Sequence, residues 1–71
     1  MIIPQQLFEK WKALRSEADT EKIAARVIET GFAVTADTIR IVFRKGKASD
    51  EVFKVMAEYY AEKADMIKEY I

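Results

Sequence analysis

Residues that interrupt helices are very rare in this chain, which contains one proline, Pro4, and two glycines, Gly31 and Gly46. Proline lacks a backbone N–H donor and suits the first turn of a helix, while glycine often ends a helix in a left-handed conformation. Between these three residues, apolar side chains recur at intervals of three and four, as they do on one face of a helix. The pattern therefore predicts an all-α fold.

Polar residues beside the interruptions indicate where each helix starts. Asp19 or Thr20 is expected to cap the second helix, Thr35 the third and Ser49 the fourth, because their side chains can accept from free N–H groups of a first turn. We predict four helices, over residues 4–17, 20–30, 36–45 and 50–69. They form one compact domain, residues 1–71, with a long C-terminal helix.

The apolar faces of these helices indicate the core. Trp11 lies on the inner face of the first helix and is expected to be a core residue rather than a stacking surface for a ligand. The expected inner residues of the later helices are Ile23, Ala24, Val27, Ile28, Ile39, Val42, Phe43, Val52, Phe53, Met56, Tyr59, Tyr60 and Ile67.

The composition argues against several kinds of function. The chain has no Cys and no His, which removes disulfides, thiolate zinc sites and the usual general base of enzymes. Its longest apolar runs have three residues, against the roughly 20 that a membrane span needs. We expect a cytoplasmic protein that is not an enzyme, without cofactor, metal, membrane contact or small-molecule substrate.

The charges are balanced overall but separated along the chain. There are 12 basic and 12 acidic residues, so the formal net charge is zero. Residues 34–49, called here the basic segment, carry Arg40, Arg44, Lys45 and Lys47 against one acid and sum to +3, whereas residues 50–71 sum to −3. Nucleic acid responds to local potential rather than to net charge, so the third helix is the candidate site.

The third helix has a polar outer face opposite Ile39, Val42 and Phe43. Helical geometry places four residues on that outer face: Asp37, Arg40, Ile41 and Arg44. The major groove of DNA admits one helix, and an Arg side chain can bond guanine with two hydrogen bonds. A charged helix face is usually only solvated, but this short helix also has the shape that groove insertion requires.

The segment VTADTIRIVFRKGK, from Val34 to Lys47, resembles the recognition-helix segment of phage-repressor-like and lac-repressor-like helix-turn-helix proteins. The matching positions are Val34-Thr35, Thr38-Ile39, Val42-Phe43 and Gly46-Lys47, preceded by Ile23-Ala24-Ala25. The resemblance covers roughly residues 20–60. It departs from the common pattern in two ways: Ala24 and Ile39 are 15 residues apart rather than about ten, and Ile41 stands where a polar residue is usual.

This resemblance implies a phage- or plasmid-type transcriptional regulator that binds double-stranded DNA as a homodimer. Thr35, Thr38 and Lys47 would then contact phosphates, and Lys45 either phosphates or bases. The residues that would face base edges are Asp37, Arg40, Ile41 and Arg44.

The last helix offers more apolar side chains than one monomer is expected to cover. Two adjacent tyrosines point about 100° apart on a helix, so we expect an exposed dimer interface there. Its predicted residues are Tyr59, Tyr60, Met66, Ile67, Tyr70 and Ile71.

Two other readings remain open. In one, the protein is an adaptor or inhibitor module whose acidic, Tyr-rich last helix binds another protein; pairing of Arg40 and Arg44 with acids of that helix would favour it. In the other, weaker reading, carboxylates such as Glu58 and Glu62 serve a minimal enzyme subunit.

Overall fold

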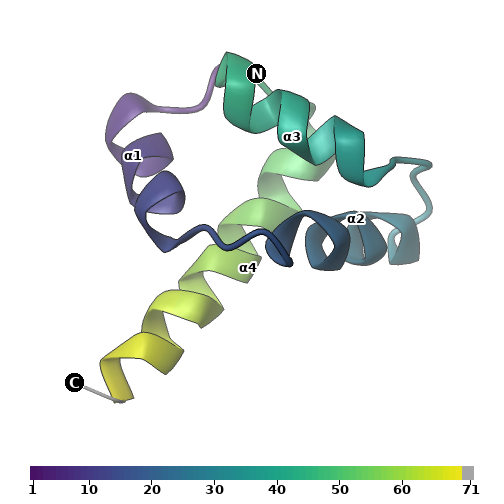
Figure 1. Cartoon of the computed structure of the whole chain (residues 1–71). Helices are drawn as coiled ribbons and strands as arrows, with labels where there is room; N and C mark the ends of the chain where they lie inside the picture. Colours follow the sequence, from purple (N-terminus) through teal and green to yellow (C-terminus); the bar gives the residue numbers. More distant parts are fainter. Residues whose placement is uncertain (70–71) are drawn as a thin grey trace.

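The computed structural model describes residues 1–69 of the chain, and it contains four α-helices (Figure 1). They are α1 (Gln5–Leu14), α2 (Asp19–Glu29), α3 (Ala36–Lys45) and α4 (Asp50–Glu69). The described residues form no strand, and their only β-type pairing is a single bridge between Ile2 and Lys47. The predicted all-α domain with a long last helix is confirmed. Within residues 1–69, no helix has the length and apolar character to cross a membrane.

The third and fourth helices start where predicted, and α2 starts one residue early, at Asp19. The first helix is shorter than predicted, because Pro4 occupies its cap position and Arg15 takes an extended backbone conformation after Leu14. Ser49 caps α4, where its hydroxyl accepts from the backbone N–H of Val52 at 3.4 Å. The cap position of α2 is occupied by Ala18, so the expectation that Asp19 or Thr20 caps this helix is wrong. Both residues lie in the first turn of α2 instead. The buried carboxylate of Asp19 accepts from Tyr59 and Lys63 of α4 rather than from the free N–H groups of α2.

Left-handed glycines follow the second and third helices, as predicted. Gly46 has φ 70° and donates its N–H to the carbonyl oxygen of Val42 at 2.8 Å, which ends α3. Gly31 has φ 101° and lies two residues past the end of α2, directly after the cap residue Thr30. The extra residues between Ala24 and Ile39 extend α2 to Glu29 and form a six-residue connection, residues 30–35.

The first half of α4 lies at the centre of the molecule and the second half projects away from the other helices (Figure 1). Trp11 is buried, as predicted, and its ring lies 5.5 Å from Phe53 and 5.7 Å from Tyr60 between centroids. Predicted core residues that prove buried are Ile23, Ala24, Val27, Ile39, Val42, Phe43, Val52 and Met56. Ile28, expected in this core, is exposed, because the inner face of α2 is filled by the other three predicted residues.

Residues before α1 are tied to the link between α3 and α4. Ile3 donates its N–H to the carbonyl oxygen of Gly46 at 2.9 Å, and Ala48 donates to that of Met1 at 3.0 Å. These bonds hold the start of α1 beside the end of α3, and the Phe8 and Phe43 rings stack at 6.1 Å.

Tyr59 and Tyr60 are core residues, so their predicted place in an exposed interface is wrong. Their exposed fractions are 9% and 1%. Both hydroxyls donate to the carboxylate of Asp19, at 2.6 Å from Tyr59 and 3.3 Å from Tyr60, and Lys63 donates to it at 2.7 Å. The tyrosines diverge as expected, but α1 covers one side of α4 and α2 the other, so both rings are covered.

The environment of Asp19 keeps this carboxylate charged. Burial alone would raise its pKa, but hydrogen bonds from Lys63, Tyr59 and Ser16 outweigh that effect and hold the pKa well below its usual range. Burial and the bond to Asp19 raise the pKa of Tyr59 to about 12. Among the described residues, no buried side-chain polar atom lacks a hydrogen-bond partner.

Candidate nucleic-acid interface

The inner face of α3 fixes its outer face toward solvent. Ile39, Val42 and Phe43 are buried, and α3 packs on α2. The rings of Phe43 and Tyr60 are nearly perpendicular, with 6.1 Å between their centroids. Because three inner side chains hold α3 in place, the helix presents one defined stripe of residues outward.

Two threonines build the start of α3. Thr35 and Thr38 form a capping box, in which the N–H of Thr35 donates to Oγ1 of Thr38 at 3.3 Å. The predicted cap is therefore confirmed. Thr35 is exposed and Thr38 half-buried, so Thr35 is the more accessible of the two expected phosphate contacts.

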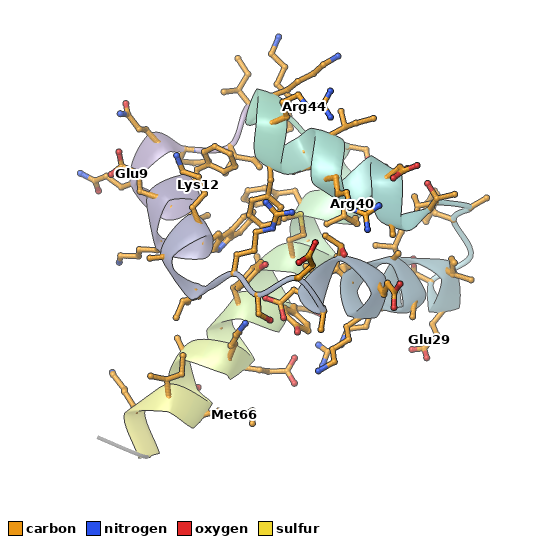
Figure 2. The ribbon with its side chains drawn as sticks, viewed as in Figure 1. Glu9, Lys12, Glu29, Arg40, Arg44 and Met66 are labelled. Atoms are coloured by element: carbon orange, nitrogen blue, oxygen red, sulfur yellow. The ribbon has the colours of Figure 1, made fainter. Side chains whose placement is uncertain are left out.

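The predicted outer stripe is exposed along its whole length. Asp37, Arg40, Ile41 and Arg44 all lie at the surface, and 43% of Ile41 is accessible. Arg40 and Arg44 extend from successive turns of α3 (Figure 2). Lys45 and Lys47 are exposed as well. The structure thus brings all the expected base-facing residues onto one surface.

Ion pairing leaves most of the positive charge of this surface available. Arg40 bonds Asp37 of the same helix, with 2.6 Å between Nη1 and Oδ1. The other ion pairs among the side chains described, those of residues 1–68, join Arg26 to Glu62 and Lys63 to Asp19. Neither Arg40 nor Arg44 is paired with an acid of α4, so the condition that would favour an adaptor or inhibitor is not met among these residues.

The structure adds two basic residues that sequence reasoning did not assign to the site, one in α1 and one directly after its end. The guanidinium of Arg15 lies 4.4 Å from the centre of the Phe43 ring, and Lys12 Nζ lies 4.9 Å from that of Phe8. Both side chains are exposed. A cation over an aromatic face is held in a defined place, so α1 contributes positive charge beside α3.

The predicted interface on α4 is only partly exposed. Met66 and Ile67 have 60% and 39% of their surface accessible, in contrast to the buried Tyr59 and Tyr60. Tyr70 and Ile71 lie outside the described residues. The apolar surface of the second half of α4 is therefore real but smaller than predicted.

The carboxylates of α4 do not gather into a site. Glu62 bonds Arg26, and this contact lowers the pKa of Glu62 and raises that of Arg26. Within residues 1–69, no three acidic side chains come close enough together to hold a metal ion.

Comparisons with known proteins identify no relative. No protein family, no curated protein and no solved structure matches the chain. The features of this protein that indicate a function are therefore the surface geometry of α3 and the sequence of the basic segment.

Proposed function

We propose that this protein is a sequence-specific DNA-binding regulator, of phage or plasmid type, that inserts α3 into the major groove. One observation carries the proposal. A short, firmly packed helix ends in the exposed Arg44 and Lys45, and the exposed Lys47 follows just after it; none of the three takes part in an ion pair of the described residues. Basic side chains on such a helix can reach both base edges and phosphates.

The position of each side chain suggests a role. Arg40, Ile41 and Arg44 lie on the outer stripe and would face base edges, with Ile41 able to contact a thymine methyl group. Asp37 holds Arg40 in the free protein and can accept from a cytosine amino group. The remaining expected contacts, mainly with phosphates, are Thr35, Thr38, Lys45 and Lys47.

A regulator of this kind acts by occupying DNA, so it performs no chemistry and needs no cofactor. Helix-turn-helix dimers place their recognition helices about 34 Å apart, one turn of duplex. A homodimer of this chain would therefore bind an operator with two-fold symmetry, in the cytoplasm. The alternative of a protein-binding module is weakened because Tyr59 and Tyr60 are buried.

Three charge variants test the proposal with one random-sequence duplex. Arg44→Glu should weaken binding by more than about tenfold, because it reverses a charge on the groove-facing stripe. Lys22→Glu makes the same charge change at an exposed position of α2 and should have little effect. Asp37→Asn should strengthen binding, since it removes a negative charge and releases Arg40. Equal losses for Arg44→Glu and Lys22→Glu would overturn the proposal.

A further inference from the structure

An apolar groove lies open between α1 and α4, with a volume of about 160 Å³. Its α1 side is formed by Leu7, Lys10, Trp11 and Leu14, and its α4 side by Ala57, Tyr60, Ala61 and Ala64. Leu7 and Leu14 are only half-buried and Ala61 is exposed. The groove is on a different part of the molecule from the basic stripe of α3.

The α4 side of this groove continues beyond the part of the helix that α1 covers. Phe53, Ala57, Tyr60, Ala64 and Ile67 follow one another at intervals of four and three, the spacing of the apolar seam of a coiled coil. Phe53 and Tyr60, in the part of α4 that α1 covers, pack against Trp11. The later residues lie on the projecting half of α4, where Ile67 is 39% exposed (Figure 1).

We infer that a second copy of this chain occupies the groove, with the two α4 helices antiparallel about a two-fold axis. The small side chains of α4 allow another helix to approach closely, because the distance between helix axes depends on the residues at the contact. In the register that we propose, Ala57 of each copy lies against Ala61 of the other. Leu7 and Leu14 of both copies then form an apolar wall along one side of the contact.

The charges beside the alanines fit this register. Lys54 lies three residues before Ala57, and Asp65 lies four residues after Ala61. In an antiparallel pair these positions meet, so Lys54 of each copy faces Asp65 of the other. Both are exposed, and neither takes part in an ion pair of the described residues.

Helix geometry supports the same pairing. Eleven residues separate Lys54 from Asp65, which is about three turns, so both side chains point to the same flank of α4 within about 20°. They are also about 16 Å apart along the helix, too far to bond within one chain. The two-fold axis makes both ion pairs at once, as an isologous interface requires.

This inference deepens the proposed function, because a two-fold operator requires a dimer. Only the biological role of the dimer rests on that proposed function. Association itself requires no DNA. Dimer formation can therefore be measured without DNA, and a monomeric protein that still binds duplex would reject the interface alone. A dimer that fails to bind duplex would reject the DNA proposal alone.

Sedimentation equilibrium of the full chain at micromolar concentration gives the first test, with a dimer as the expected result. Ala61→Glu should raise the dissociation constant of the dimer by more than about tenfold, because a charge would be buried without a partner. Since Ala61 is exposed in the monomer, circular dichroism should show an unchanged fold. A monomeric parent protein, or an unaltered dissociation constant for Ala61→Glu, would overturn the inference.

A charge exchange tests the register. Lys54→Glu should weaken the dimer by about three- to tenfold, since it replaces two exposed attractions with two repulsions. Adding Asp65→Lys to that variant should restore the parental dissociation constant. Because the chain has no cysteine, a mixture of the Ala57→Cys and Ala61→Cys proteins should form a disulfide-linked dimer on mild oxidation, while a mixture of Lys22→Cys and Ala61→Cys should not. Absence of restoration, or equal crosslinking in both mixtures, would contradict the register.

Discussion

The hydroxyl of Tyr59 donates a 2.6 Å hydrogen bond to Oδ1 of Asp19, 40 residues earlier in the chain. The same carboxylate accepts from Tyr60, from Lys63 and from both the N–H and the hydroxyl of Ser16. One buried side chain therefore joins the link between α1 and α2 to the middle of α4.

Asp19→Asn should destabilise the protein by about 3 kcal/mol. The variant leaves Lys63 without a charged partner, and breaking a buried ion pair costs about 3–5 kcal/mol; the lower end applies because Lys63 is partly exposed. Tyr59→Phe loses one hydrogen bond to a charged group and should cost about 1.5–3 kcal/mol. Urea unfolding measures both values. An Asp19→Asn variant as stable as the parent would show that the network does not stabilise the fold.

Stability should depend on pH through the same carboxylate. The folded protein holds the pKa of Asp19 below its usual value of 3.8, despite a burial effect in the opposite direction. Its contribution is therefore complete above about pH 4 and is lost as pH falls toward the folded pKa. The raised pKa of Tyr59 makes stability depend on pH in the alkaline range as well. The contribution of Tyr59 to stability is lost as pH rises from about 10 toward 12. Urea unfolding across pH should show a smaller acid loss for Asp19→Asn than for the parent.

Gly46→Ala should destabilise the protein by about 1–2 kcal/mol, because φ 70° is a left-handed conformation that is strained for a side-chain-bearing residue. An added Cβ would lie 3.7 Å from the Phe8 ring, an ordinary contact, so crowding adds little. Gly31 has φ 101°, and a Cβ added there would have no neighbouring atom within 4 Å. The Gly31→Ala variant therefore isolates the effect of backbone strain. Thermal unfolding measures both variants, and unchanged stability would contradict the argument.

Alanine variants should separate base contacts from phosphate contacts. Arg44→Ala should reduce discrimination between operator and random duplex by about 1–3 kcal/mol, and Arg40→Ala should act in the same direction. Arg15→Ala and Lys47→Ala should weaken binding to both duplexes about equally, because phosphates carry no sequence information. Competition titrations with the two duplexes measure the ratio. A loss of discrimination with Lys47→Ala but not with Arg44→Ala would reverse the assigned roles.

The helices could be predicted because their signals are local. Pro4, Gly31 and Gly46 act on their own backbone, and the spacing of Ile39, Val42 and Phe43 fixes the inner face of α3 within a few residues. The exposed stripe with Arg40 and Arg44 follows from that face alone. These parts of the site needed no knowledge of how the helices pack.

Contacts between distant residues could not be predicted in this way. The sequence indicates Asp19 as a helix cap, and nothing nearby shows that Tyr59 and Tyr60 donate to it. Arg15 directly follows α1, and its place over Phe43 depends on how α1 and α3 pack. Lys12 and Arg15, three residues apart beside the apolar stripe, were the available signal for this added charge.

A salt titration of duplex binding tests the DNA-binding role of α3 most directly. Each phosphate neutralised by a basic side chain contributes about −0.9 to the slope of log K against log salt concentration. With three or four such contacts, a slope of about −3 per copy is predicted, and the double variant Lys45→Ala/Lys47→Ala should have a slope nearer to about −1. No binding by the parent at about 50 mM salt, or a parental slope for the double variant, would contradict the proposed function.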